Sequence, residues 1–244
     1  MVKNHMKRIT APRTWNVNRK TTKFITKPLP GPHKLDQAVA INTFMKELTN
    51  LTSTTKETKY VLTNNEVLIN GKRKRDFKNQ IGFLDVLSIK ELNKHFLVTV
   101  DNKGALKPKE INEKQSKQRL LKISGKTIIA KDKIQLNTMN GENVLVNEKE
   151  AKKYKVGDSL IVELDTLKIT EHIALQEKST VFVYMGKHSS KTGTIEATNQ
   201  KSVLIKSEKE SFETSKDYLI AVNKEKITEL EWKWIKWKIS KSRK

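Results

Sequence analysis

The stretch Leu68–Ile89, LINGKRKRDFKNQIGFLDVLSI, joins an apolar strand, an Asn-Gly turn, four consecutive cations and a second apolar strand. Asn70-Gly71 predicts a two-residue hairpin turn, because both central residues of such a turn take positive φ. The turn itself does not require the cations Lys72 to Arg75. Four like charges on a rigid turn repel one another unless something negative lies opposite. The stretch therefore predicts both a local fold and a negatively charged partner.

The charge of the whole chain points the same way. The 244 residues include 49 Lys and Arg against 27 Asp and Glu, a formal net charge of +22. This balance favours a polyanionic partner: nucleic acid, an anionic membrane or a strongly acidic protein. Only seven of the basic residues are Arg. Because Lys binds phosphate as a point charge and Arg reads planar groups, the composition favours contact with a nucleic-acid backbone over readout of bases.

The composition also excludes several classes of protein. The chain has no Cys, which rules out disulfides and thiolate zinc sites and fits an intracellular location. The N-terminus lacks the apolar core of a signal peptide, and no apolar run approaches the ~20 residues of a spanning helix, so we expect a soluble protein without a membrane partner. The apolar share of 36% suits several small cores in a row.

Residues 1–35 read as a basic N-terminal arm. They contain no Asp or Glu, several prolines interrupt any helix, and the apolar residues show no period. Alone, the arm should be extended or disordered. A solvated tail is the simpler interpretation, but the uninterrupted positive charge and the stackable ring of Trp15 favour an arm that folds onto RNA. The cations of the arm are Lys3, Lys7, Arg8, Arg13, Arg19, Lys20, Lys23, Lys27 and Lys34.

Two helices are predicted after the arm. The first covers Leu35–Leu48 and buries a stripe at i, i+3, i+4, i+7 spacing. This stripe is formed by Ile41, Phe44, Met45 and Leu48. A capping box at Thr54–Glu57 starts the second helix, which ends at Asn64-Asn65. We expect the second helix to turn Tyr60, Val61 and Leu62 inward.

Beyond Ile89 the pattern predicts strands almost throughout. Residues 133–146 form a hairpin that turns at Asn140-Gly141, residues 155–169 supply two strands, and residues 179–207 supply three. Short strands separated by regular turn signals indicate small barrels or sandwiches, and no βαβ unit is visible. The predicted fold class is therefore mixed α+β and mainly β.

The sequence contains no catalytic or metal-binding constellation. Gly125-Lys126-Thr127 resembles the end of a phosphate-binding loop, but position 120, where that loop needs glycine, is Leu, so we interpret the tripeptide as a strand turn. The histidines never fall at metal-ligand spacing, and no Gly-x-Ser-x-Gly elbow occurs. We therefore predict a protein that is not an enzyme and that holds no cofactor and no metal.

The last stretch, Glu231–Lys244, carries three of the four Trp residues among six basic residues. Two interpretations of it stay open. The stretch is either a final edge strand that packs its Trp side chains on a neighbour, or a tail that docks on RNA or protein.

Five segments follow one another along the chain and together carry a resemblance. They are HMKRITAPRTW (His5–Trp15), PLPGPHKLDQAV (Pro28–Val39), NGKRKRDFKNQIGFLDVLSI (Asn70–Ile89), KIQLNTMNGENVLV (Lys133–Val146) and SFETSKDYLIAV (Ser211–Val222). In this order they closely resemble the S4e family of small-subunit ribosomal proteins of archaea and eukaryotes. The chain looks like the shorter archaeal form of that family.

The resemblance implies a division into five parts. These are a basic arm over residues 1–36, an S4-type RNA-binding module of two helices and a hairpin over 37–92, a family-specific β domain over 93–174, a KOW module on an SH3-like barrel over 175–223, and the Trp-rich tail over 224–244. The RNA-facing residues expected in the first two parts are Lys3, Lys7, Arg8, Arg13, Trp15, Arg19, Lys20, His33, Lys34, Lys56, Lys59, Lys72, Arg73, Lys74 and Arg75.

The KOW match is STVFVYMGKHSSKTGTIEAT, Ser179–Thr198. By this resemblance Gly193 is the central glycine of the motif and Gly186 its upstream turn; with Gly71 they form the set of structural glycines. We expect Gly193 to need either positive φ or close approach to RNA, since both exclude a Cβ. The loop between the two glycines presents Lys187, His188 and Lys191 to a phosphate or to a neighbouring protein.

The function implied by the resemblance is that of a structural constituent of the small ribosomal subunit. The chain would scaffold 16S-type rRNA as a monomer among neighbouring ribosomal proteins in the cytoplasm, mostly through phosphate and shape, and so support subunit assembly and translation. Two alternatives remain: a non-ribosomal RNA-binding regulator, and an S4-type appendage of an RNA-modifying enzyme. The second needs a large catalytic domain, which the short β modules of residues 90–244 do not offer.

Overall fold

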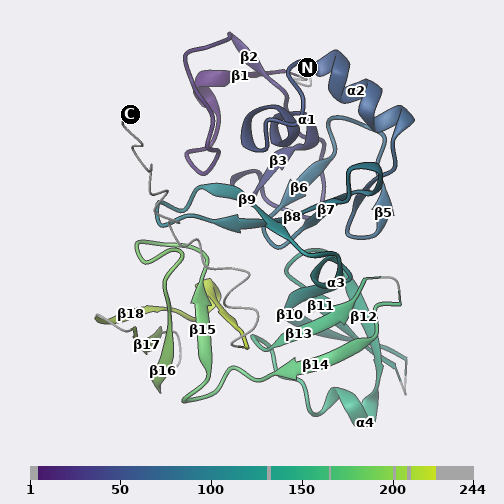
Figure 1. Cartoon of the computed structure of the whole chain (residues 1–244). Coiled ribbons are helices and arrows are strands. Elements are labelled where there is room, and N and C mark those ends of the chain that lie inside the picture. The colour runs from purple at the N-terminus through teal and green to yellow at the C-terminus, as the bar shows by residue number, and fades with distance from the viewer. Residues whose placement is uncertain (1–4, 131–132, 165, 200–201, 208–209, 224–244) are drawn as a thin grey trace, which may run out of the picture.

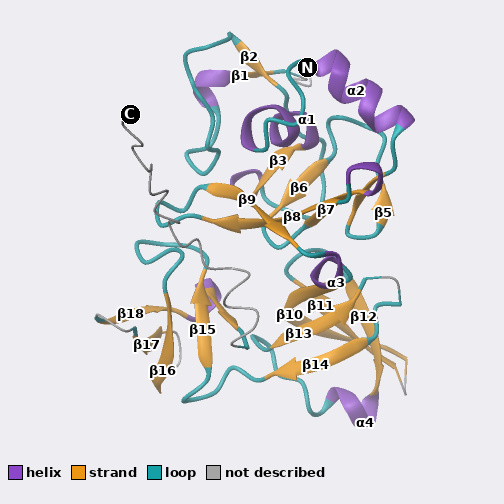
Figure 2. Ribbon diagram, in the orientation of Figure 1, coloured by secondary structure: helices purple, strands orange, loops and turns teal. Residues whose placement is uncertain are grey.

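The computed structural model describes residues 5–130, 133–164, 166–199, 202–207 and 210–223, and most of its elements are strands (Figure 1, Figure 2). Three five-stranded sheets form three blocks, one in the upper part of Figure 1 and two side by side below it. Within these residues every sheet is antiparallel. The predicted class, mixed α+β and mainly β, is confirmed. The boundaries of the five parts remain a prediction.

The upper block contains the arm, two helices and the first large sheet. The order of this sheet is β5 (Lys72–Arg73), β4 (Val67–Ile69), β7 (Val86–Ile89), β8 (Lys94–Val100) and β9 (Leu106–Ile111). Two short ladders lie beside it: β1 (Met6–Lys7) with β2 (Phe24–Ile25), and β3 (Ala38–Ala40) with β6 (Gln80–Gly82). The helices are α1 (Ile41–Thr43), which continues as a π-helical turn over Phe44–Leu48, and α2 (Thr55–Asn64).

The two lower blocks follow along the chain. The second sheet has the order β12 (Asn143–Asn147), β11 (Lys133–Thr138), β10 (Gln118–Ala130), β13 (Ser159–Glu163) and β14 (Ile169–Ile173). Short helices α3 (Glu113–Ser116) and α4 (Glu148–Ala151) flank it. The third sheet has the order β18 (Ser211–Ser215), β17 (Ser202–Lys206), β16 (Thr192–Thr198), β15 (Thr180–Val183) and β19 (Leu219–Ala221). The predicted hairpin of residues 133–146 is confirmed. Of the two strands expected within residues 155–169, β13 lies there, whereas β14 begins only at Ile169 and extends beyond the expected range.

The arm is packed rather than extended, which corrects the prediction from its composition. Trp15 is 2% exposed, its Nε1 donates to the Leu35 carbonyl at 3.1 Å, and its backbone forms a bridge with Leu106 of β9. Ala11 and Ile25 lie in the same apolar cluster. The arm has no core of its own, as its sequence predicts. The first sheet supplies the apolar surface against which the arm packs.

The first predicted helix starts later than expected. Ala38–Ala40 form strand β3, and the helix begins at Ile41, because the backbone of residues 38–40 pairs with β6. The stripe residues Ile41, Phe44 and Met45 are buried as predicted. In α2 the capping box of Thr54 and Glu57 and the end at Asn64 are confirmed. Leu62 is buried, but Tyr60 is 68% exposed, so its predicted inward direction is wrong.

The blocks do not have separate cores. One apolar cluster runs from Trp15 through Phe44 and Leu87 to Leu120 of β10 and Phe182 of β15, and so reaches all three sheets. Smaller clusters fill the second and third sheets from their other faces. The apolar residues, 36% of the chain, thus form one core shared by the three blocks and two smaller clusters. The stability of each block therefore depends on its contacts with the others.

Two glycine assignments change. Gly125-Lys126-Thr127 lies inside β10, opposite β11, and is not a turn. Gly193 lies inside β16 without positive φ; a Cβ there would stand 2.5 Å from the Lys206 carbonyl oxygen and 2.6 Å from Ile205 Cγ2. Glycine is needed because β17 approaches closely, and the approaching group is protein. The Trp-rich stretch after residue 223 lies outside the described residues.

Replacement of Gly193 by Ala is expected to destabilise the third sheet by more than ~1 kcal/mol, whereas a Gly-to-Ala change at an open, compatible site stabilises a protein by about 0.4–1 kcal/mol. The added methyl would overlap backbone atoms of β17, which cannot rotate away. Urea unfolding of the full chain, followed by circular dichroism, measures the difference. The matched control is Gly125→Ala in β10, where the nearest atom to an added Cβ is 3.9 Å away. Equal stability of wild type and Gly193→Ala would contradict this account of the close approach.

Candidate nucleic-acid interface

The cationic hairpin has the geometry that its sequence predicts. Ile69 pairs with Lys72 and Leu68 with Arg73, and Asn70 and Gly71 form the turn with φ of 51° and 76°. Lys72, Arg73 and Arg75 are exposed, and Lys74 is half-buried. Because the turn consists of Asn70 and Gly71 alone, the backbone that carries the cations after it has a fixed conformation.

The hairpin lies against the end of α2. Arg73 Nη2 donates to the Thr63 carbonyl oxygen at 3.3 Å, and Lys59 Nζ lies 4.6 Å from the centre of the Phe77 ring, just beyond the cations. Hairpin and helix therefore present one continuous surface, at the upper right of Figure 1. We call it the hairpin–α2 face. Its cations are Lys56, Lys59, Lys72, Arg73, Lys74 and Arg75.

Three carboxylates near this face accept from backbone N–H groups: Asp76, which follows Arg75 and accepts from the Lys78 N–H at 2.8 Å, Glu57 and Glu91. Glu57 Oε2 accepts from the backbone N–H of Ser53 at 2.7 Å and of Thr54 at 3.3 Å, so it turns toward the start of α2. Glu91 accepts from the Glu66 N–H at 2.6 Å. That bond is the main reason why the pKa of Glu91 is lowered, and the charge of Arg73 contributes. Among the described residues no carboxylate forms an ion pair with any of the six cations of the face.

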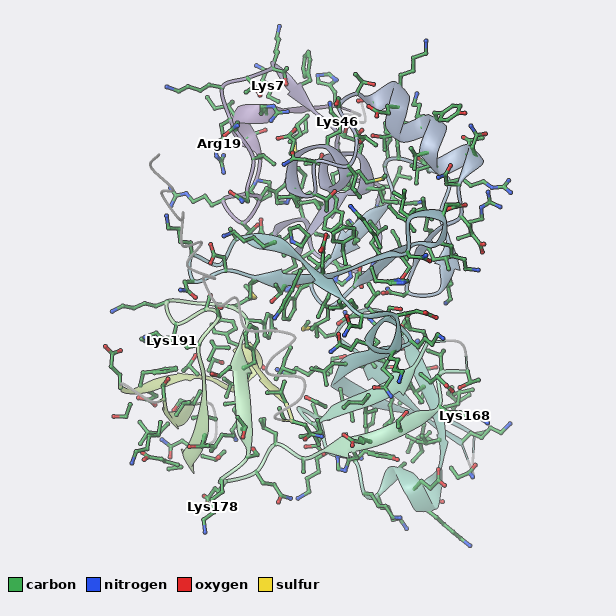
Figure 3. The ribbon with its side chains drawn as sticks, in the orientation of Figure 1. Lys7, Arg19, Lys46, Lys168, Lys178 and Lys191 are labelled. Atoms are coloured by element: carbon green, nitrogen blue, oxygen red, sulfur yellow. The ribbon has the colours of Figure 1, made fainter. Side chains whose placement is uncertain are left out.

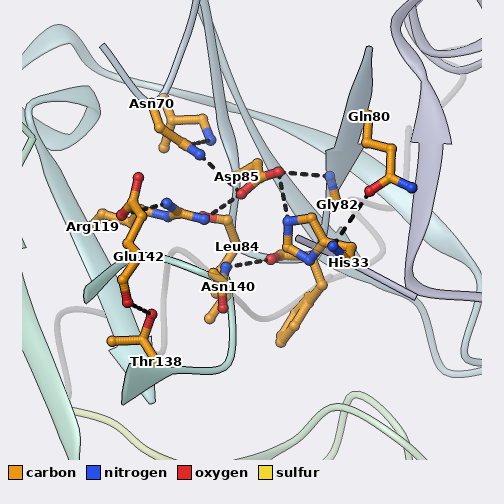
Figure 4. A network of polar contacts seen from close by, with 12 residues as sticks. His33, Asn70, Gln80, Gly82, Leu84, Asp85, Arg119, Thr138, Asn140 and Glu142 are labelled. Atoms are coloured by element: carbon orange, nitrogen blue, oxygen red, sulfur yellow. Dashed lines mark hydrogen bonds and ion pairs between the residues drawn. The ribbon is translucent and has the colours of Figure 1, made fainter. Parts of the chain in front are cut away.

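A buried carboxylate holds the turn from inside. Asp85 Oδ1 accepts from Asn70 Nδ2 at 3.0 Å, and Asn70 Oδ1 in turn accepts from the Val86 N–H at 2.9 Å (Figure 4). The other oxygen of Asp85 accepts from the Gly82 N–H at 2.8 Å and lies 2.8 Å from His33 Nε2. Asn70 is therefore more than a turn residue, because its side chain fastens the hairpin to β7.

The partner of Asp85 comes from the second sheet. Arg119 of β10 pairs with Asp85 through Nη2 and donates from Nε to the Leu84 carbonyl at 3.1 Å. Its Nη1 forms an ion pair with Glu142 at 2.8 Å, and Asn140 Nδ2 donates to the Phe83 carbonyl at 3.0 Å. The turn between β6 and β7 thus contacts the second sheet in two ways: Asp85 forms an ion pair with Arg119, and the carbonyl oxygens of Phe83 and Leu84 accept hydrogen bonds.

The network keeps Asp85 ionised. Burial alone would raise the pKa of this carboxyl, but the Arg119 charge and the His33 contact outweigh burial and hold its pKa at about 2. His33, 6% exposed, is part of this interior. The implied RNA contact of His33 is therefore not available in this structure.

The arm divides its cations between two roles. Lys7, Arg13, Lys20 and Lys34 are exposed, with Lys7 at the top of Figure 3. Arg8 is buried and pairs with Glu47 at 2.6 Å, which raises the pKa of Arg8.

Arg19 also serves the protein itself: it donates to the carbonyl oxygens of Ile9, Ala11 and Pro12 at 2.7–3.2 Å. The exposed cations of the described arm are lysines and Arg13, and the buried ring of Trp15 is not available for stacking. Lys3 lies outside the described residues.

The loop between β15 and β16 holds its polar residues partly in place. Gly186 takes a φ of 90°. Lys187 is exposed, whereas His188 stacks on Phe212 with ring centres 4.2 Å apart. Lys191 pairs with Glu210 at 3.2 Å and is labelled at the left of Figure 3, in a different block from α2. This loop is thus a second, separate cationic site, and Lys187 is its most accessible charge.

The described residues form neither a metal site nor a membrane-spanning helix. No three His, Asp or Glu side chains come together in a way that could hold a metal ion. No helix in the same part of the chain has the length and apolar character needed to cross a membrane.

Comparisons with known proteins agree on one family. The model of "Ribosomal family S4e" matches residues 92–169, and that of the "RS4NT (NUC023) domain" matches residues 2–36. The small ribosomal subunit protein eS4 of Methanosphaera stadtmanae is 34% identical over 230 residues, which cover 92% of this chain and 94% of that protein. The eS4 of Methanospirillum hungatei is 35% identical over 233 residues, 91% and 95% of the two chains. The crystal structure of the 30S ribosomal protein S4e from Thermoplasma acidophilum is similar with a TM-score of 0.67 at 29% identity, and the match covers 78% of this chain and 97% of that one.

Replacement of Asp85 by Ala is expected to lower the free energy of unfolding by about 3–5 kcal/mol, because Arg119 is then buried without its main partner. In the wild type the contribution of Asp85 is complete above its unfolded pKa of ~3.9 and is lost as the pH falls through about 2, since the folded pKa is the lower one. Urea unfolding between pH 2 and pH 7 measures both effects. Asp36→Ala, at an exposed position, is the control. If Asp85→Ala had the same free energy of unfolding as the wild type at pH 7 and the same loss of stability between pH 4 and pH 2, the ion pair of Asp85 and Arg119 would contribute nothing to stability.

Proposed function

The chain belongs to the S4e family of ribosomal proteins, and we propose that it is a structural constituent of the small ribosomal subunit that scaffolds small-subunit rRNA. Its role is structural rather than catalytic. It takes its place as one copy per subunit among neighbouring ribosomal proteins, in the ribosome of the cytoplasm. Its binding surfaces, in this proposal, are the hairpin–α2 face, the exposed cations of the arm and the loop around Lys187.

The hairpin–α2 face is the observation that carries the proposal. Six cations share this face, and within the described residues none forms an ion pair with a carboxylate, so most of their mutual repulsion has no direct counter-charge in the protein. A phosphate backbone relieves it, and each phosphate contact releases condensed counterions. Because these side chains are mainly lysines without a preset bidentate partner, the face suits backbone and shape recognition rather than reading of base edges.

The packed arm supports the same function by a different route. An arm that is already folded against β9 loses little conformational entropy when RNA binds. Its exposed cations Lys7, Arg13, Lys20 and Lys34 stand on the same block as the hairpin–α2 face. A single RNA could therefore contact the arm and the hairpin together, and the two sites would act on one partner.

A non-ribosomal regulator is the alternative from the sequence, and the comparisons do not favour it. The relatives match over nearly their whole length and are named as small-subunit proteins. A regulator would leave the subunit under salt that an embedded protein resists. Sedimentation of small subunits through a high-salt gradient, with detection of this chain in the particle fraction, tests the proposal; release at moderate salt would count for the regulator.

Replacement of Lys72, Arg73, Lys74 and Arg75 by Ala is expected to weaken binding to a small-subunit rRNA transcript and to flatten its salt dependence. Each lost phosphate contact removes roughly 0.7–0.9 from the slope of log K against log salt, so the full change is about 3. The hairpin should stay folded, since Asn70 keeps its bonds to Asp85 and Val86. Filter binding over a salt series gives the slope.

The matched control removes four exposed lysines near α4, Lys149, Lys152, Lys153 and Lys155, and so changes the net charge equally. This region lies at the lower end of the molecule in Figure 1, away from the hairpin–α2 face. An equal effect of both quadruple variants would mean that only net charge matters, and the hairpin–α2 face would lose its special role.

A further inference from the structure

We propose that Tyr60 is a stacking platform for an unpaired base of the RNA on the hairpin–α2 face. The inference rests on the proposed function and extends it, because it adds recognition of an unstacked nucleotide to a surface so far described by phosphate contacts alone. Trp15 was the aromatic residue that the sequence suggested for this task, and it is buried. Tyr60 was expected inside and is 68% exposed.

The position of Tyr60 on α2 places it among the cations. Helical side chains three or four residues apart lie on one face, so Tyr60 has Lys56 one turn before it and Thr63 one turn after it. Thr63 is the residue whose carbonyl accepts from Arg73. Tyr60 thus lies about one helical turn from Lys56 and from Thr63, on the side of α2 away from the buried Thr58 and Leu62.

The ring of Tyr60 has no internal use in the described structure. No ring contact, cation–π contact or side-chain hydrogen bond involves it, and two other exposed aromatic residues differ in this respect. Phe24 meets the ring of His5 at 5.2 Å and has Lys23 above it at 5.5 Å. Tyr218 lies against Gly186, where an added Cβ would be 3.4 Å from its ring. Of these three exposed aromatic residues in the described part of the chain, Tyr60 is thus the one whose ring meets neither another ring, nor a cation, nor a glycine.

The surroundings favour a nucleotide over an apolar protein segment. The one carboxylate of α2, Glu57, turns away toward Ser53 and Thr54. Lys59 Nζ lies 4.6 Å from the centre of the Phe77 ring, and among the described contacts no cation lies over the ring of Tyr60, which is 68% exposed. An aromatic face between positive charges accepts a base on the ring and phosphates on either side, as single-stranded binding surfaces do. Bases inside an A-form helix are already stacked, so the base must be unpaired.

The test separates stacking from charge by using the salt slope. The full chain and its Tyr60→Ala variant are titrated with a small-subunit rRNA transcript over a salt series. Loss of one stacked base is expected to weaken binding about 5- to 150-fold without a change in slope, because no phosphate contact is removed. Tyr60→Phe should bind like wild type. Lys56→Ala should reduce the slope by roughly 0.7–0.9.

Two further comparisons define the control and the ligand. Leu145→Ala removes a 60% exposed apolar side chain on β12 and should leave binding unchanged. With a single-stranded adenosine dodecamer as probe, Tyr60→Ala should lose affinity, whereas with a blunt RNA duplex it should match wild type. Thermal melting of Tyr60→Ala should equal that of wild type, since the ring is not part of a core.

Several outcomes would overturn the proposal. Wild-type affinity of Tyr60→Ala, a slope reduced by Tyr60→Ala, or an equal loss on the dodecamer and the duplex each exclude base stacking at this residue. Binding of Tyr60→Phe as weak as that of Tyr60→Ala would assign the effect to the hydroxyl. A wild-type chain that binds the transcript without any salt dependence would instead remove the proposed function, so the two failures are distinguishable.

Discussion

The buried ion pair between Asp85 and Arg119 is the interaction on which the arrangement of the chain depends. Each side chain is 2% exposed, and a charge taken out of water is tolerated only with an opposite charge and hydrogen bonds beside it. Asp85 lies between β6 and β7, and Arg119 comes from β10 of another sheet. Neither block can move away without leaving an unpaired charge in an apolar core. The pair therefore fixes the position of the second sheet relative to the first.

The four residues Gly82–Asp85 extend this constraint to every part of the described chain. Phe83 reaches the third sheet, where its ring lies 5.2 Å from that of Tyr184. Leu84 has a φ of 64°, a conformation that costs a residue with a Cβ on the order of 1–3 kcal/mol and persists only where neighbouring contacts enforce it. Asp85 meets the arm at His33 and the hairpin at Asn70. The hairpin cations that we propose to meet RNA therefore lie beside a constrained junction, and the hairpin backbone loses little freedom when they bind.

The features that the sequence predicted are local, and those that it missed depend on distant partners. The turn at Asn70-Gly71 and the capping box of Thr54 and Glu57 are decided by residues a few positions apart, and both are present. Trp15 could not be placed, because its burial depends on Leu35 and Leu106. Tyr60 was misplaced because it adjoins Val61 and Leu62, and adjacent apolar residues on a helix cannot all face inward. Asp85 in the run GFLDVL is a sequence signal from which the buried ion pair could have been predicted, because an acidic residue inside an apolar run implies a buried partner.

The basic residues of the described chain include two groups: arginines that are bonded within the protein, and exposed lysines that we propose to contact RNA. Arg8, Arg19 and Arg119 use their hydrogen bonds inside the protein, so that the arm and the blocks are held together before any RNA is present. Most of the described lysines of the arm and of the hairpin–α2 face, by contrast, are exposed to solvent on a chain with a net charge of +22. Their repulsion opposes the compact state and is relieved only by a polyanion. The internal arginines thus hold the arm and the blocks together through contacts within the protein, and the exposed lysines lie on the surface that these contacts support.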